Sequence, residues 1–323
     1  MTLVFLLQFV IPLVVIGWVA LAPPRALIGF WIQVFASMAA LCAMALLGIW
    51  LLPPWWAPYG FGAALAAAAG AGVWRRRPFA SALPMTWGAR TAVALFVVLG
   101  VASTYFIAVA LRSRTAPPEP SVALAFPLES GTYLVVNGGN DINTNAHLMT
   151  LDARIPKFRD WRGQSYGVDI VKLDALGLRA RGVLPADPKA YRIYGARVLA
   201  PCAGQVLMAV DGLPDMQVPQ VDRAHLAGNH VMLRCADPTV NATVRADVLL
   251  GHLRPGSVQV RAGARVAVGD WLGSAGNSGN TSEPHLHVHA QRPGPVGTPL
   301  GGDPLPILFN GRFPVRGDRI DAP

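Results

Sequence analysis

Acidic residues are absent from the first 118 residues of this 323-residue chain, and all 18 of them lie from Glu119 onward. The charged side chains before that point are seven arginines, namely Arg25, Arg75, Arg76, Arg77, Arg90, Arg112 and Arg114. A segment with so few charges is suited to a bilayer, where apolar side chains face lipid rather than water. The sequence therefore predicts an N-terminal membrane region followed by a soluble domain.

Four apolar stretches divide the N-terminal region, at residues 3–21, 27–52, 59–74 and 91–111. Because their lengths are near the ~20 residues that cross a bilayer as a helix, we expect four transmembrane helices within residues 1–114. Three spans are the alternative, since the third stretch is short and rich in alanine and glycine. A signal peptide at the first stretch is disfavoured because no basic residue precedes it. The stretches contain no ionisable Asp, Glu, Lys, Arg or His, which favours an anchor in the lipid bilayer over a transporter.

The arginines indicate how these helices are oriented. Arg25 follows the first stretch, and Arg75–Arg77 and Arg90 follow the third, whereas the loop after the second stretch is uncharged. Short basic loops stay in the cytoplasm, so both chain ends are expected outside; Arg112 and Arg114 oppose this orientation but are fewer. Because membrane orientation accounts for much of the net charge of +9, we expect no nucleic-acid binding.

The sequence TAPPEPS at residues 115–121 predicts an extended linker, because successive prolines lack the amide donors of a helix. Residues 122–323 then show short apolar runs separated by Gly, Pro and Asn, which is typical of a mostly antiparallel β domain. Strands are expected at residues 133–136, 167–171, 197–200, 205–210, 230–233, 244–250, 258–260 and 286–290. Cys202 and Cys235 lie in two strand-like segments, and an extracytoplasmic setting permits a disulfide between them.

The segment GNSGNTSEPHLHVHA, residues 276–290, carries the most chemical information. A glycine-rich loop leads there into a strand with His285, His287 and His289. Alternate residues of a strand point to one face, so these imidazoles would line one surface. Neutral imidazole is a preferred zinc ligand, and a catalytic zinc takes three protein ligands and a water. Since one strand rarely supplies a whole site, further ligands are expected from elsewhere in the chain.

PHLHVH with the preceding GSAGNSGNTSE, together with ARVLAPCAGQVL and GHLRPGSVQVRAGARVAVGDWLG, resembles the signature regions of LytM/lysostaphin-type zinc metallopeptidases. These enzymes cleave peptide bridges in bacterial cell walls, and the resemblance covers roughly residues 131–290. It implies that His287 is a zinc ligand and that His252 and His285 act as an acid/base pair. It also implies peptidoglycan peptides as substrate and a domain on the extracytoplasmic side of the bacterial cytoplasmic membrane.

The chain departs from the family pattern at the remaining zinc ligands, a His and an Asp that the family takes from an HxGxD element. Here the element is SYGVD, so Ser165 stands at the histidine position and Asp169 is kept. Some similar chains carry an NxH segment ahead of a QxYxxD element, which this sequence matches with His147 and with Gln164, Tyr166 and Asp169. We therefore predict His147, Asp169 and His287 as ligands of Zn2+. The alternatives are a turn or solvent contact for His147 and an ion pair with an arginine for Asp169, because a carboxylate is costly to bury alone.

Several other polar residues accompany these motifs. His289 shares a face with His287 and is expected to support the site or contact substrate. His225 and His230 receive no role. Four residues of the glycine-rich loop either hold a peptide backbone at the rim of a cleft or simply form the turns, namely Asn277, Ser278, Asn280 and Thr281.

The resulting hypothesis is a membrane-anchored zinc metalloendopeptidase that hydrolyses peptidoglycan with zinc-activated water. The alternative is a degenerate LytM-like module that binds peptidoglycan or activates another hydrolase, because family members with incomplete zinc sites behave in this way. Completeness of the zinc site discriminates between the two. Because Ser165 occupies the usual histidine position, the distinction depends on whether His147 supplies the missing ligand.

Overall fold

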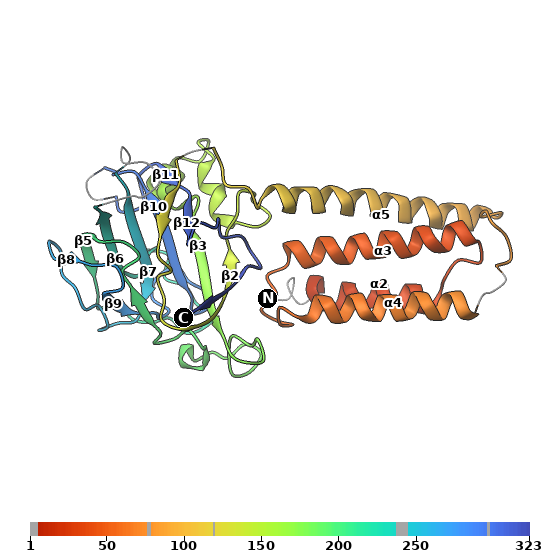
Figure 1. Cartoon of the computed structure of the whole chain (residues 1–323), viewed down its shortest axis with the longest axis horizontal. Coiled ribbons are helices and arrows are strands. Elements are labelled where there is room, and N and C mark those ends of the chain that lie inside the picture. The colour runs from red at the N-terminus through yellow and green to blue at the C-terminus, as the bar shows by residue number, and fades with distance from the viewer. Residues whose placement is uncertain (1–5, 76–78, 119, 237–244, 296–297) are drawn as a thin grey trace. The chain divides into compact units, whose positions relative to one another are not determined.

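The computed structural model describes residues 6–75, 79–118, 120–236, 245–295 and 298–323 (Figure 1). The chain divides into two compact units, Met1–Arg112 and Ser113–Pro323. Each unit has its own cluster of buried apolar side chains, so each is described by itself.

The first unit is made of apolar helices. A short π-helical segment, η1 (Leu6–Val10), runs directly into α2 (Ile11–Leu21), and α3 (Leu27–Leu47), α4 (Ala57–Arg75) and α5 (Trp87–Arg112) follow. Val19, Phe30 and Leu65 are fully buried where these helices pack together. Two loops meet at one end of the unit, because the backbone amides of Leu27 and Ile28 donate to the carbonyls of Ser81 and Ala82 at 3.0 and 3.1 Å.

Two of the helices, α3 and α5, are long and apolar enough to cross a membrane, with mean hydropathy of 2.0 and 2.4. The expectation of four transmembrane helices is therefore wrong by this measure. The described segment Leu6–Leu21 forms only about 24 Å of helix, short of the ~30 Å hydrocarbon core. Helix α4 is long enough, but its alanines and glycines make it less apolar.

The second unit is built on a nine-stranded sheet with strand order β13-β2-β3-β10-β7-β6-β5-β8 and β11 paired to β10. All pairings in this sheet are antiparallel, which confirms the expected mostly antiparallel β domain. Two small sheets accompany it, the antiparallel pair β4–β9 and the parallel pair β1–β12. The strands are β1 (Val122–Leu124), β2 (Gly131–Asn137), β3 (Val168–Leu173), β4 (Arg197–Leu199), β5 (Gly204–Val210), β6 (Asn229–Cys235), β7 (Asp247–Leu253), β8 (Arg265–Val266), β9 (Trp271–Ser274), β10 (Leu286–Gln291), β11 (Pro304–Leu305), β12 (Ile307–Phe309) and β13 (Arg319–Ala322).

Most of the predicted strands are present, but the one at residues 258–260 is wrong. Val258 and Val260 do pack against the core, yet they do so from a loop. The backbone amide of Val258 donates to the Asp211 carboxylate and that of Gln259 to the Leu272 carbonyl, so no ladder forms. Alternating valines therefore marked burial rather than a strand. Val244, the first residue of another predicted strand, lies outside the described residues.

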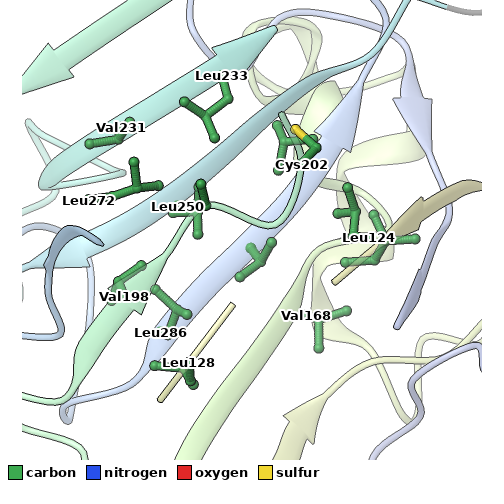
Figure 2. Packing of buried hydrophobic residues seen from close by; sticks show 14 of the residues in the cluster. Leu124, Leu128, Val168, Val198, Cys202, Val231, Leu233, Leu250, Leu272 and Leu286 are labelled. Carbon is green, nitrogen blue, oxygen red and sulfur yellow. The ribbon is translucent and has the colours of Figure 1, made fainter. Parts of the chain in front are cut away.

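The two faces of the nine-stranded sheet differ in character. Alternate residues of the central strands enter one apolar core, which the small sheets cover; Figure 2 shows this core through Val168, Val198, Val231, Leu233, Leu250, Leu272 and Leu286. The intervening residues must point to the opposite face because strand side chains alternate. That opposite face carries Asp169, Gly251, His287 and His289, so the same strands that build the core also build a polar surface.

The predicted disulfide is confirmed. Cys202 and Cys235 are bonded, with Cα atoms 5.6 Å apart. Both belong to the apolar core, and the bridge ties the chain just before β5 to the end of β6. Among the described residues, Cys42 is the free cysteine.

Three 3-10 segments lie between the strands, namely η2 (Ala146–Leu151), η3 (Pro156–Gln164) and η4 (Pro188–Ala190). The Asn145 side chain caps η2, since its Oδ1 accepts the His147 backbone amide. In this way a short cap fixes the start of the segment that carries His147.

Candidate metal centre

Three residues that are distant in sequence meet on the polar face of the sheet. Asp169 in β3 and His287 in β10 are direct partners in the antiparallel register, and His287 Nδ1 lies 2.9 Å from Asp169 Oδ1. His147, in the first turn of η2, places its Nε2 3.5 Å from Asp169 Oδ2. One donor atom from each residue lies within 4.8 Å of the others. The structure thus brings together the three residues that the sequence predicted as ligands.

The donor set fits zinc. Tetrahedral zinc with bonds of ~2.0–2.1 Å holds its donor atoms about 3.3 Å apart, close to the separation of His147 Nε2 and Asp169 Oδ2. His147 Nδ1 lies 3.0 Å from Asn145 Oδ1, an atom that only accepts, so Nδ1 carries the proton and Nε2 keeps its lone pair. Two imidazoles and one carboxylate leave a fourth position for water, as a hydrolytic zinc requires.

Glycines let the strands approach at this point. A Cβ on Gly167, in the SYGVD element, would lie 2.7 Å from His287 Cε1, closer than real side chains allow. Gly251 is the partner of His287 on the other side, in β7. The imidazole of His287 therefore lies between two positions that lack side chains.

The electrostatics keep the predicted ligands in their binding forms. Burial raises the pKa of Asp169, but the interactions with His147 and His285 and the hydrogen bonds from His285 and His287 outweigh it, so the pKa falls well below its usual value. Burial lowers the pKa of His147 to about 4, against the opposing effect of Asp169. At neutral pH the site therefore presents a carboxylate and a neutral imidazole.

Ser165, at the usual histidine position, is fully buried and serves a different purpose. Its Oγ lies 2.8 Å from Thr150 Oγ1 and donates to the Arg162 carbonyl at 2.6 Å. Thr150 lies in η2, and its hydroxyl donates to the His147 carbonyl at 2.7 Å. Ser165 thus contacts the segment that brings His147 into the site.

The two predicted acid/base histidines lie together beside this cluster. The rings of His252 and His285 have centroids 4.7 Å apart, and the His252 ring lies 5.8 Å from that of His287. Their Nδ1 atoms lie 2.9 Å from the carbonyl oxygens of Ser278 and Glu283. A carbonyl only accepts, so each Nδ1 is protonated and each Nε2 can exchange a proton.

His252 has an unusual backbone, with φ of +62°. This left-handed conformation costs a non-glycine residue free energy and occurs often at functional sites. The His252 amide donates to the Ala227 carbonyl at 2.9 Å, which holds the residue in this conformation.

The two acid/base histidines differ in their tendency to bind a proton. Burial, followed by the charges of His285 and His287, lowers the pKa of His252 well below its usual value. Burial also lowers the pKa of His285, but Asp169 and hydrogen bonds to Asp169 and the Glu283 carbonyl outweigh it, so the pKa is raised. The pair therefore presents one neutral imidazole and one that holds a proton more readily.

The remaining predicted residues fall into two groups. His289 is fully buried, and its Nδ1 lies 3.0 Å from His287 Nε2, so it contacts a predicted ligand. His230 is buried beside Gly228, whereas His225 is exposed and pairs with Asp222. The loop residues Asn277, Ser278 and Thr281 are buried and bonded within the protein, which favours the turn interpretation, and Asn280 alone of the four is exposed.

An open pocket of about 330 Å³ lies next to these residues. Its lining is mostly apolar and includes Trp161, Leu226 and Leu300. Ala227 and Gly228 also line the pocket, and the Ala227 carbonyl is the one bonded to His252. The pocket is thus linked to His252 through the backbone of Ala227, and its lining contains none of the predicted ligands or acid/base residues.

Sequence reasoning missed several supporting residues. The Asn137 side chain donates to Asp169 Oδ2 at 2.9 Å, and the Asp215 carboxylate accepts the Asn277 amide at 2.6 Å. The largely buried pair of Arg179 and Glu283, 2.9 Å apart, fixes the residue whose carbonyl holds His285. No motif marks these residues, because their roles arise from segments that meet only in the fold.

Residues 190–299 match peptidase family M23, so this part of the chain is an M23 peptidase domain. The match includes His252, His285 and His287 but not His147 or Asp169. A search of curated proteins found no match.

Solved structures similar to the chain include M23-type peptidases. The solution structure of lysostaphin is 20% identical over 41% of this chain and 38% of its own, with a TM-score of 0.26. A putative M23 peptidase from Pseudomonas aeruginosa is 16% identical over 59% and 54%, with a TM-score of 0.27. A zinc-containing peptidase from Vibrio cholerae is 19% identical over 38% and 46%, with a TM-score of 0.22. The chain thus spans only about two fifths to half of the length of these proteins.

Proposed function

We propose that this protein is a membrane-anchored zinc metalloendopeptidase that hydrolyses peptide bonds of bacterial peptidoglycan. The observation that supports this most is the meeting of His147, Asp169 and His287 beside the imidazole pair of His252 and His285. The M23 match makes a peptidase the reaction class to expect, and peptidoglycan is the substrate that this family resemblance implies.

In this proposal His147, Asp169 and His287 hold the metal. Bound zinc lowers the pKa of a coordinated water and polarises a carbonyl. His252, neutral at its Nε2, accepts a proton from the attacking water, and His285 donates one from its Nε2 to the departing amine. The open pocket beside Ala227 receives a side chain of the peptide and orients it.

The helical unit is proposed to anchor the enzyme in the cytoplasmic membrane. Helix α5 supports this, because only 11% of its most apolar window is buried within the protein. We propose α3 and α5 as the membrane spans of this anchor. Arg25 lies in one of the two loops that meet at one end of the unit, and Arg90 lies in the first turn of α5, directly after the other loop. This basic end is then the cytoplasmic end. Since α5 starts at that end, the chain after Arg112 continues on the extracytoplasmic side.

Purified full-length protein, incubated with peptidoglycan, tests the proposed reaction. We expect new free amino groups in the products, loss of this activity with a zinc chelator, and recovery with zinc. Zinc binding without hydrolysis would instead support the degenerate module that binds peptidoglycan. A reporter fused after Arg114 tests the topology and should be active outside the cytoplasm.

A further inference from the structure

Arg316 lies in the turn between β12 and β13, outside the residues that match the peptidase family. Its backbone follows the end of β2 closely, since the Arg316 amide donates to the Gly138 carbonyl and the Gly317 amide to that of Val135. The guanidinium is thereby brought to the β2 residue that contacts Asp169, which is Asn137.

The guanidinium donates hydrogen bonds to the end of β2 and to the loop that follows it. Arg316 Nε donates to the Val136 carbonyl at 2.9 Å, Nη1 to the Asn143 carbonyl at 2.6 Å, and Nη2 to Asn137 Oδ1 at 2.9 Å. The rigid planar fork of arginine presents these donors at fixed angles, which a lysine ammonium cannot reproduce. One side chain therefore links the end of β2 to the loop that precedes His147.

The contact with Asn137 determines which way its amide points. An arginine has donors only, so Oδ1 must face Arg316, and Nδ2 then faces Asp169, whose Oδ2 accepts it at 2.9 Å. Asn137 Oδ1 also accepts the backbone amide of Ala146, the residue before His147, at 3.4 Å. Both predicted ligands from this half of the domain thus depend on the same asparagine.

We infer that Arg316 is a positioning residue for the metal centre, acting through Asn137 on Asp169 and through Asn143 on the loop that leads to His147. This inference rests on the proposed zinc site. Hydrogen bonds to the ligands of a metal commonly change its affinity by ~10–100-fold, which sets the size of the expected effect.

The test measures the zinc dissociation constant of the full-length protein by competition with a chelator. We expect Arg316→Ala and Arg316→Lys to weaken zinc binding by ~10–100-fold, and by similar factors, because lysine keeps the charge but loses the fork. Asn137→Ala should cause a comparable loss. The double variant Arg316→Ala/Asn137→Ala should lose less than the product of the two single losses, because part of the effect of Arg316 passes through Asn137.

Arg234→Ala is the matched control, since the Arg234 guanidinium also makes two hydrogen bonds, to the Asp247 carboxylate at 2.9 and 3.0 Å. This pair lies at the start of β7, whereas Gly251, the partner of His287, lies near the end of that strand. The control variant should leave the zinc dissociation constant unchanged. Hydrogen exchange of the β-domain amides in each metal-free variant shows whether the domain is folded.

The outcomes separate the two claims. If the unchanged protein binds no zinc, the proposed function fails. If it binds zinc and Arg316→Lys binds equally well, only the positive charge matters and the positioning role is wrong. An additive loss in the double variant would also overturn it, because the residues would then act independently.

Discussion

The proposed metal centre combines two regions that relate to the family pattern in different ways. Residues 190–299 match the M23 family and hold His252, His285 and His287 where the motif predicts them. Residues 131–173 lie outside the match and provide His147 and Asp169. In the second region the predicted histidine ligand, His147, lies in η2 and not at the usual motif position, which Ser165 occupies.

The comparison shows that a histidine from a different segment of the chain can bring its donor atom to the place that the usual motif histidine would occupy. Ser165 lies four residues before Asp169, but its hydroxyl contacts the hydroxyl of Thr150. His147 reaches Asp169 from a separate segment and is held there by its own cap at Asn145. If both regions bind the same zinc ion, removing a ligand from either region should weaken zinc binding.

The largest effects should come from one ligand in each region. Asp169→Ala and His287→Ala should each lose zinc and peptidase activity together, because a two-ligand zinc is weak. Metal analysis and hydrolysis assays on the purified variants check this. If either variant keeps both zinc and activity, the two regions do not share the site.

Next in size is the loss of the acid/base pair, which belongs to the matched region alone. His252→Ala and His285→Ala should keep zinc but hydrolyse peptidoglycan ~10²–10⁴-fold more slowly, the usual range for a lost proton-transfer group. Single-turnover rates on zinc-loaded protein measure this. Loss of zinc in either variant would show that the substituted histidine binds the metal rather than transferring a proton.

A smaller effect is expected from acid on the metal-free protein. Burial lowers the pKa of His147 to about 4, below the ~6.5 of an unfolded chain, so the unfolded state binds more protons between these values. Stability should therefore fall as the pH drops from ~6.5 toward ~4, by about 2–3 kcal/mol for His147 alone. Buried His252 and His289, with lowered pKa, act in the same direction, and His285, with a raised pKa, opposes them.

Hydrogen exchange of the β7 and β10 amides at pH 7 and near pH 4.5 measures this change. His147→Gln is the control, because a neutral amide cannot titrate, and its stability should fall less over the same interval. An equal fall in both proteins would assign the acid sensitivity to other groups.

The smallest effect concerns Ser165. Ser165→Ala removes a buried hydroxyl that contacts Thr150 and should lower the free energy of unfolding by about 1–2 kcal/mol while zinc is retained. Denaturant unfolding and metal analysis check this. Loss of zinc from Ser165→Ala would show that the hydroxyl does more than hold η2.

Much of the β domain was predictable because short apolar runs between turn residues mark strands such as β6 and β10. The short strands β8 and β11 were not, since two residues carry no periodicity. In the site, the alternation of His285, His287 and His289 indicated a shared face, and the family resemblance added His252. Asn137 and Arg316 could not be predicted, because 179 positions separate them and only the fold brings their side chains to 2.9 Å.

In the helical unit the sequence predicted the helices but not which of them are candidate membrane spans. Apolar composition marked the four helices correctly as helices, but among the described residues length and hydropathy single out α3 and α5 as candidate spans. The reason is that alanine and glycine, abundant in α4, are apolar enough to fill a helix and too small to make it strongly hydrophobic.

The most direct test of the account is the zinc content of four purified full-length proteins, the unchanged chain, His147→Ala, Ser165→Ala and His225→Ala. His225 is an exposed histidine paired with Asp222, so its removal controls for the loss of an imidazole. The account predicts about one zinc per chain in the unchanged protein, Ser165→Ala and His225→Ala, as a single three-ligand site holds one ion, and almost none in His147→Ala. Full zinc in His147→Ala would contradict it and would exclude η2 as the source of the third ligand.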